Sequence, residues 1–294
     1  TENLEAFAKA QAAVAEAARS LQDPELEGIL ELLARYRRTV EAGEQFPGSR
    51  DGQSAAPEAV LGLKPEAVRN VTLKGRDTGS AIKALARLGL STRLAPLEGY
   101  RFLALSSGPV WNPSPAGSGE LSAGTSPDPK PEYMGSERSA GGGQGVFDLH
   151  QLALELQAPA NARSFSFDFN FFSAEYPEYV QQSFNDTFYA ILEAPSTNGG
   201  RTTNIAFDAK GNSIEVDNNY FQQPFHPIPN TGTGFDRHGS TGWLRTSWPI
   251  RGGERFRLTF SIHDEGDAIY DSLVLLDNFQ WHDFDSVGAT DPLN

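Results

Sequence analysis

The stretch 163–172, R-S-F-S-F-D-F-N-F-F, constrains the fold of this 294-residue chain more than any other part of it. Its aromatic residues recur at every second position, namely at Phe165, Phe167, Phe169 and Phe171. The positions between them hold polar residues, namely Ser164, Ser166, Asp168 and Asn170. Because successive side chains of a strand point to opposite faces, this alternation predicts a β-strand with one buried face. Such a strand needs a second apolar layer to cover its phenylalanines.

Other segments carry the same kind of pattern and are separated by Gly, Asn and Pro turns. In the C-terminal half, the expected strands are 152–156, 187–192, 203–208, 213–216, 242–246, 255–263 and 273–281. Earlier in the chain, 67–73 and 100–107 also read as strands, whereas 80–88 has helical spacing. Many strands without intervening helices predict a mainly β fold, an antiparallel β-sandwich of jelly-roll type.

The N-terminal region has a different pattern. Residues 2–21 are rich in Ala and Glu and place apolar residues on one narrow seam, and Asp23-Pro24 offers a helix start before a second apolar stripe that ends at Gly43. We expect an α-helical hairpin over 1–43, which packs on or extends the following domain, or self-associates through its Ala-rich face. Residues 44–64 then read as a linker.

The sandwich domain is expected to span 65–285, with a tail at 286–294. Within it, 108–145 is rich in Gly, Pro and Ser, which predicts a long surface loop.

Composition excludes several classes of function. The net charge of −14 argues against a nucleic-acid surface, and the absence of cysteine excludes disulfides and zinc-thiolate sites. No stretch is long and apolar enough to span a membrane, and we expect no signal peptide within this sequence. The apolar content of 38% is enough for a proper core.

The stretch 262–279 concentrates negative charge beside a run that must be buried. It contains Asp264, Asp267, Asp271 and Asp277, and the last two flank the apolar residues 273–276. Carboxylates this crowded repel one another at neutral pH, so they need either full solvation or a cation. The alternatives are therefore a solvated acidic turn and a bound Ca²⁺ at the mouth of the sandwich.

Two more carboxylates stand in loops that could reach the same place. Glu175 follows the phenylalanine-rich strand, and Asp186 precedes the next one. Ca²⁺ takes about six to eight oxygen ligands, which separate loops can supply. We therefore expect a Ca²⁺ site if the strands are neighbours, with the candidate ligands Glu175, Asp186, Asp264, Asp267, Asp271 and Asp277.

Three segments carry a resemblance to a known family. They are 171–188 (F-F-S-A-E-Y-P-E-Y-V-Q-Q-S-F-N-D-T-F), 239–244 (G-S-T-G-W-L) and 264–279 (D-E-G-D-A-I-Y-D-S-L-V-L-L-D-N-F). Together with V-R-N-V-T-L at 68–73 and F-L-A-L-S-S-G-P at 102–109, they resemble the bacterial choice-of-anchor L domain over roughly 65–285. The resemblance implies a β-rich, metal-stabilised module of secreted and surface-attached proteins, with no common enzymatic activity. The helical hairpin lies outside it.

Aromatic residues gather among Asn, Gln and Pro between 217 and 248. Flat apolar faces beside amides are the chemistry of a sugar or peptide surface. The candidate binding residues are Tyr220, Phe221, Phe225 and Trp243. The alternative is that these aromatic side chains cap the core of the sandwich.

These features favour a non-enzymatic, Ca²⁺-stabilised binding or adhesion module, extracellular or at the surface of a bacterium, with a glycan or protein partner. Three alternatives stay open: a lectin-like carbohydrate-binding domain, a coat or fibre protein assembled through the helices, and a glycoside hydrolase. The hydrolase would pair Glu175 with Glu178 or Asp186. The sequence contains no nucleophile elbow, zinc-protease helix or phosphate-binding loop.

Overall fold

The computed structural model describes residues 16, 56–88, 94–110, 145–182, 184–221, 233–235, 238–266 and 269–293. The predicted hairpin over 1–43, apart from Glu16, lies outside the described residues. Most of the predicted loop 108–145, Phe225 and Asp267 also lie outside them. The expectations for these parts stay predictions.

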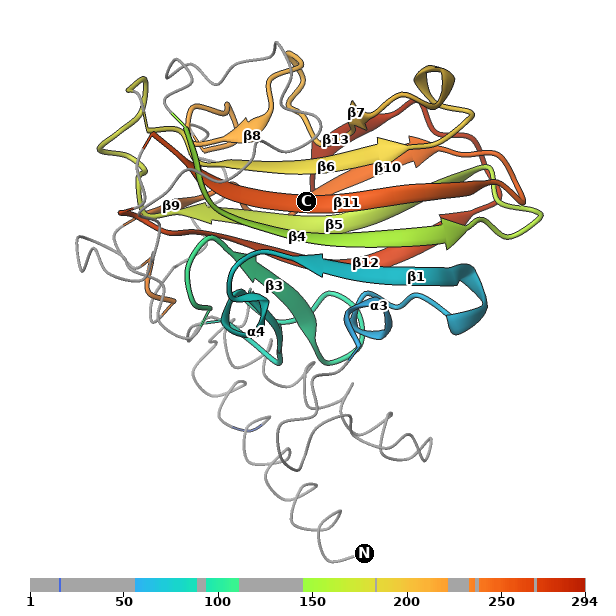
Figure 1. Ribbon diagram of the computed structural model, residues 1–294, viewed down its shortest axis with the longest axis horizontal. Coiled ribbons are helices and arrows are strands. Elements are labelled where there is room, and N and C mark those ends of the chain that lie inside the picture. Colours follow the sequence, from blue (N-terminus) through green and yellow to red (C-terminus); the bar gives the residue numbers. More distant parts are fainter. Residues whose placement is uncertain are drawn as a thin grey trace, which may run out of the picture.

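The described residues form two antiparallel sheets that pack face to face (Figure 1). The first sheet has the order β1 (Val68–Lys74), β4 (Val146–Gln157), β11 (Arg255–Glu265), β6 (Thr187–Glu193) and β7 (Thr203–Asn204), and β8 (Ile214–Glu215) also pairs with β6. The second sheet has the order β13 (Ala289–Pro292), β10 (Leu244–Pro249), β5 (Ser164–Ser173), β12 (Ser272–His282), β3 (Phe102–Ser106) and β2 (Ile82–Leu85), and β9 (Gly239–Ser240) also pairs with β5. The prediction of a mainly β antiparallel sandwich is confirmed.

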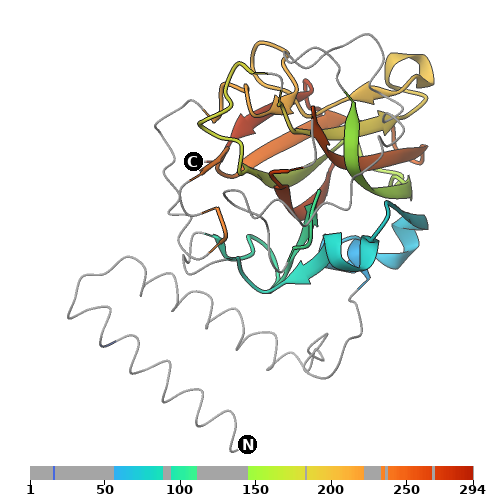
Figure 2. The same cartoon turned by 60° about the vertical axis from the view of Figure 1, so that its left-hand side comes forward.

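Helices are short in the part of the chain that the structure describes. They are α3 (Pro57–Val60), η1 (Pro65–Ala67), α4 (Thr78–Ala81) and η3 (Asn198–Gly200). Figure 2 shows α3 and α4 beside the sandwich, on the side of the first strands.

The phenylalanines of β5 form the centre of the core, as their spacing predicts. All four are fully buried, and they pack across the gap between the sheets. The ring of Phe167 lies 5.0 Å from that of Phe260 on β11, and the ring of Phe169 lies 5.1 Å from that of Phe188 on β6. Each such buried side chain contributes about 1.5–3 kcal/mol of transfer free energy.

The opposite face of β5 is buried too, which corrects the expectation of a single buried face. The polar residues Ser164, Ser166, Asp168 and Asn170 are all fully buried. A second apolar cluster, which includes Leu94, Phe102 and Trp243, covers the part of this face next to Phe172, whereas Arg245 and His282 bind Asp168 and Ser166. A period of two shows which residues share a face but not what covers that face.

Several predicted boundaries also differ from the structure. The segment 80–88 is mostly not helical, because α4 ends at Ala81 and β2 pairs with β3 at the edge of the second sheet. The predicted tail contains β13, which pairs with β10. The predicted linker contributes Leu61 and Leu63 to the core. The structure of these segments depends on pairing and packing with residues that are distant in the sequence, which a local pattern does not show.

The strand directions define two ends of the sandwich. At the acidic end, on the left of Figure 1, β3, β5 and β11 finish and β4, β6 and β12 begin. At the turn end, on the right, β4, β10 and β12 finish and β5 and β11 begin.

Candidate functional site

Asp186 lies at the centre of the acidic end, just before β6, and is fully buried. Its backbone N–H donates to Oε2 of Glu175 over 3.2 Å. Its own carboxylate accepts from the backbone N–H of Glu265 over 3.2 Å and from the hydroxyl of Ser272 over 2.6 Å. Asp186 therefore joins the end of β11, the start of β12 and the loop after β5.

Asp264 stands beside it, at an irregularity in the pairing of β11 with β4 that follows Ile262. The side chain is only 1% exposed, and neither carboxylate oxygen has a hydrogen-bond partner among the described residues. Burial raises the pKa of Asp264 well above its ordinary value, and the charges of Asp186 and Asp271 raise it further. The nearby Ser107 hydroxyl acts in the opposite direction, although it forms no hydrogen bond of normal geometry with this carboxylate.

Asp271 reaches the same place from the start of β12. It is fully buried, and its backbone carbonyl accepts from the N–H of Ala174 over 3.2 Å. Its carboxylate lies against Gly108, where an added Cβ would sit only 2.2 Å from Oδ2. The absence of a side chain at residue 108 is therefore what lets the Asp271 carboxylate approach the loop after β3.

We call Glu175, Asp186, Asp264 and Asp271 the carboxylate cluster. Burial raises the pKa of Asp186 to about 8, although hydrogen bonds from Ser272 and Glu265 act the other way. Glu215 on β8 behaves in the same way, because burial raises its pKa to about 8 as well. Without a cation, these groups have to hold protons near neutral pH or carry a buried charge.

The structure brings together four of the six predicted metal ligands. Asp267 lies outside the described residues, and Asp277 stands apart, six residues beyond Asp271 along β12, or roughly 20 Å in an extended strand. Oδ2 of Asp277 accepts from the backbone N–H groups of Leu97 and Glu98 over 2.6 and 3.1 Å, and its Oδ1 accepts from that of Asn278 over 2.8 Å. Backbone amides thus take the place of the cation expected at Asp277, which ties residues 97–98 to the second sheet.

As they stand, no three His, Asp or Glu side chains within the described ranges are arranged to hold a metal ion. The carboxylate cluster is a set of neighbouring groups rather than a formed coordination shell. A cation there needs side-chain rotation and further ligands from backbone carbonyls, water or the turn that contains Asp267.

The predicted aromatic binding residues lie mostly inside the protein. Trp243 is 7% exposed and packs on Phe102 in the outer cluster, with ring centroids 6.2 Å apart. Phe221 is 5% exposed and packs edge-on against Phe171, at 5.6 Å. The hydroxyl of Tyr220 donates to the carbonyl of Thr290 over 2.6 Å, and burial raises its pKa to about 12. Phe221 and Tyr220 therefore pack on the core between the sheets, and Trp243 packs in the outer apolar cluster. This agrees with the alternative interpretation, in which these aromatic side chains cap the core.

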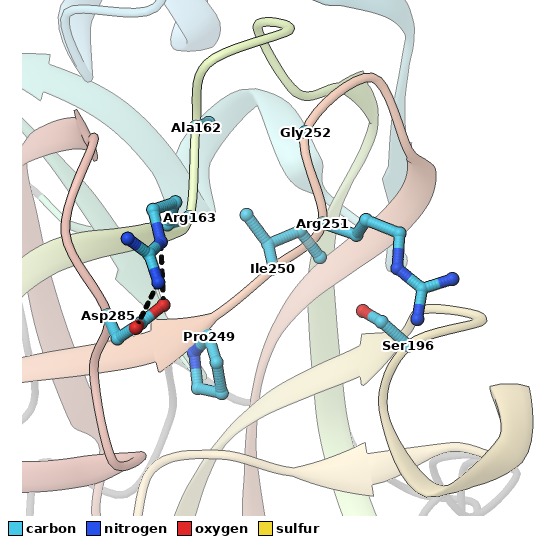
Figure 3. A pocket seen from close by; sticks show the side chains of 8 residues that line it. All are labelled: Ala162, Arg163, Ser196, Pro249, Ile250, Arg251, Gly252 and Asp285. Carbon is cyan, nitrogen blue, oxygen red and sulfur yellow. Dashed lines mark hydrogen bonds and ion pairs between the residues drawn. The ribbon is translucent and has the colours of Figure 1, made fainter.

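Among the described residues, the turn end includes hollows that the sequence pattern did not indicate, and two of them are large enough to describe. The smaller, of about 340 Å³, is drawn in Figure 3 with Arg163, Ser196, Arg251 and Asp285 among its lining residues. Figure 3 shows Arg163 paired with Asp285, and Nε of Arg163 lies 2.8 Å from Oδ1 of Asp285. The Ser196 hydroxyl donates to Glu254 over 2.5 Å. Arg163, Asp285 and Ser196 of this hollow are therefore already engaged in hydrogen bonds.

The larger hollow, which we call the Trp281 groove, has a volume of about 770 Å³. It lies between the segment that contains η1, the turn after β4 and the end of β12. Its lining residues are Gly62, Lys64, Glu66, Ala67, Arg69, Gln157, Ala158, Pro159, Ala160, Asn161, Gly253, Phe279, Gln280 and Trp281. The one signal that could have found it is an aromatic residue at the end of a strand, next to an exposed amide.

Fold and site together define an antiparallel β-sandwich module with a buried acidic end. The family model of the Choice-of-anchor L domain matches residues 66–280, so the chain belongs to this family. The resemblance carried by the three sequence segments is thereby confirmed. No curated protein matches the chain with significant similarity.

Solved structures with some likeness include carbohydrate-binding modules and an adhesin domain. TmCBM61 in complex with beta-1,4-galactotriose is 13% identical, with a TM-score of 0.31 over 79% of this chain and 99% of that one. The K2 cleaved adhesin domain of Lys-gingipain is 13% identical, with a TM-score of 0.35 over 81% of this chain and 94% of that one. A non-crystalline cellulose specific module, CBM28, is 12% identical, with a TM-score of 0.30 over 79% and 96%. At these TM-scores the likeness says nothing about a ligand of this chain.

No helix among the described residues is long and apolar enough to cross a membrane.

Proposed function

We propose that this chain is a non-enzymatic binding module of the bacterial cell surface whose acidic end binds Ca²⁺ and is stabilised by it. Membership of the choice-of-anchor L family supports the surface location. The observation that carries the Ca²⁺ proposal is Asp264, which is buried beside Asp186 and Asp271 and whose two carboxylate oxygens form no hydrogen bond of normal geometry among the described residues.

The physical argument rests on the cost of a buried charge. A carboxylate without a partner in a protein interior either takes up a proton or meets a cation. In the carboxylate cluster, burial and mutual repulsion both oppose ionisation, so one divalent cation relieves both costs. Asp186, Asp264 and Asp271 supply oxygen ligands in this proposal, and Glu175, backbone carbonyls and water complete the shell.

A glycoside hydrolase is a weaker interpretation of the same carboxylates. Such an enzyme needs two carboxyl groups that face a cleft open to the substrate. Glu175 is 2% exposed and Asp186 is fully buried, whereas Glu178 is exposed to solvent. A serine beside a histidine can form the nucleophile and base of another class of hydrolase, and the Ser166 hydroxyl lies 2.8 Å from Nε2 of His282. Ser166 is fully buried, however, so a substrate cannot reach it. These placements favour a structural role for the cluster.

The partner in this proposal is a surface glycan or protein. Self-association through the predicted helices of 1–43 concerns residues outside the described ones and stays a prediction.

Calorimetric titration of the metal-free protein with Ca²⁺ tests the proposal. The parent should bind, and Asp264→Asn should not, because the variant lacks the charge that the cation neutralises. Asp264→Asn should also be at least as stable as the metal-free parent at pH 8, since it replaces a buried group that must either hold a proton or carry an uncompensated charge.

Asp277→Asn is the matched control, because it neutralises a buried aspartate that lies outside the carboxylate cluster, within β12. It should bind Ca²⁺ like the parent. Equal binding by Asp264→Asn and the parent would exclude this site.

A further inference from the structure

We propose that the Trp281 groove binds a short saccharide and prefers one that carries a carboxylate. The groove lies at the turn end and shares no residue with the carboxylate cluster, so the proposal does not depend on Ca²⁺ binding there. Its volume of about 770 Å³ falls within the range of roughly 300–1,000 Å³ that is usual for small-molecule sites.

Trp281 gives the groove a rigid aromatic wall. Its indole makes perpendicular ring contacts with Phe279, Phe256 and Phe165, with centroids 5.1, 5.9 and 6.2 Å apart. The side chain is only partly buried, so part of it remains on the wall of the groove. An aromatic surface already held in place can pack against the C–H face of a sugar ring at little entropic cost.

Hydrogen-bonding groups surround this wall. Nε and Nη2 of Arg69 donate to Oε1 of Gln157 over 3.1 and 2.6 Å, which fixes the guanidinium beside the groove and leaves it further N–H donors. Nε2 of Gln280 donates to Oδ1 of Asn278 over 2.6 Å, so the Gln280 side chain is held at the end of β12. Asn161 adds an exposed amide from the turn after β4. Planar amides and a guanidinium suit adjacent sugar hydroxyls.

The charge of the lining decides which saccharide is favoured. Lys64 and Arg69 are exposed cations in the groove, and Glu66 is its one carboxylate. The groove is thus locally positive in a chain whose net charge is −14. A cationic site on an anionic protein favours a ligand with a negative group, such as a uronic acid unit.

Calorimetric titration with galacturonic acid trimer and with a neutral glucose trimer tests the proposal on the whole chain. The galacturonate should bind more tightly. Gln280→Ala should weaken binding of both trimers about fivefold, the effect of one lost hydrogen bond. Lys64→Ala should weaken binding of the galacturonate alone. Trp281→Phe, which keeps an aromatic ring in the core, should weaken binding of both.

Gln182→Ala and Lys210→Ala serve as matched controls, since both side chains are exposed and lie outside the groove. They should bind like the parent. The proposal would be overturned if neither trimer bound to the parent. It would also be overturned if all three groove variants bound both trimers with the same affinity as the parent. Equal affinity for the two trimers, unchanged in Lys64→Ala, would overturn the preference for a carboxylate.

Discussion

The metal-free protein should lose stability as the pH rises from 6.5 to 8, and Ca²⁺ should reduce that loss. The reason is the raised pKa of Asp186, about 8 in the folded protein against an ordinary value of 3.8. Between these two values the folded state holds a proton that the unfolded state has released. Stability therefore falls with rising pH throughout this interval.

The window from pH 6.5 to 8 isolates this effect from opposing ones. Burial lowers the pKa of His263 from 6.5 to about 3, so this group raises the stability as the pH rises from about 3 to about 6.5. Above pH 6.5 it is neutral in both the folded and the unfolded state and no longer affects the pH dependence. The lowered pKa of Asp208 matters only below about its ordinary value of 3.8. Glu215, with a pKa of about 8, and Asp277, with a pKa of about 7, act in the same direction as Asp186.

The size of the effect follows from linkage. One proton held across 1.5 pH units corresponds to at most about 2 kcal/mol for Asp186 alone, since each pH unit is worth about 1.4 kcal/mol. For a domain of this size, about 2 kcal/mol shifts the melting temperature by roughly 4–8 °C. Ca²⁺ displaces the protons of the carboxylate cluster. It should therefore abolish the loss of stability that Asp186 causes, whereas the losses caused by Glu215 and Asp277 should remain.

Thermal unfolding followed by circular dichroism, at several pH values with chelator or with millimolar Ca²⁺, measures the difference directly. The two melting temperatures should separate as the pH rises. Identical curves with and without Ca²⁺ at pH 8 would refute the cation site, and a metal-free protein that gains stability from pH 6.5 to 8 would refute the raised pKa values.

Other substitutions test contacts beside the carboxylate cluster and within the second sheet. Gly108→Ala should lower the free energy of unfolding by about 1–3 kcal/mol and weaken Ca²⁺ binding, because its Cβ displaces the Asp271 carboxylate; denaturant unfolding and calorimetry would show both. Asp277→Asn should lower the free energy of unfolding by about 1–3 kcal/mol, because it weakens the acceptor for the N–H groups of Leu97 and Glu98. Hydrogen exchange at these two amides should become faster, and unchanged exchange would contradict the assigned contact. Arg245→Ala leaves the buried Asp168 without its bidentate partner, so the free energy of unfolding in urea should fall by about 2 kcal/mol or more. An unchanged free energy of unfolding would show that the ion pair does not stabilise the fold.

The sequence predicts the inner layer of the sandwich well, because strand periodicity is local. The alternation from Phe165 to Phe171 identifies the face that meets the first sheet. It does not identify what covers the opposite face, since Leu94, Phe102 and Trp243 come from segments far apart in the chain. The same limitation explains why Trp243 resembles a ligand contact in the sequence and is a core residue in the structure.

The Trp281 groove shows a second limit of the sequence. Lys64, Gln157 and Trp281 come from three distant segments. The pairing of β1 with β4 brings the first two together, and the packing of the first sheet on the second places them near the end of β12. No spacing in the sequence encodes that meeting. A site formed by the ends of several strands depends on the order of the strands in both sheets, which local patterns do not specify.

Strand direction explains why some predicted ligands meet and Asp277 does not. Glu175 follows the end of β5, Asp186 precedes β6 and Asp271 precedes β12, and all three strand ends lie at the acidic end because neighbouring strands are antiparallel. Asp264 joins them because it stands at the end of β11. Asp277 lies within β12, so the extended backbone carries it away from that end by about 3.3 Å for each residue. The four carboxylates that meet satisfy one condition, namely that each lies within one or two residues of a strand end at the acidic end. Strand limits expected from the periodicity alone are enough to apply this condition, and they already place Asp277 inside a strand.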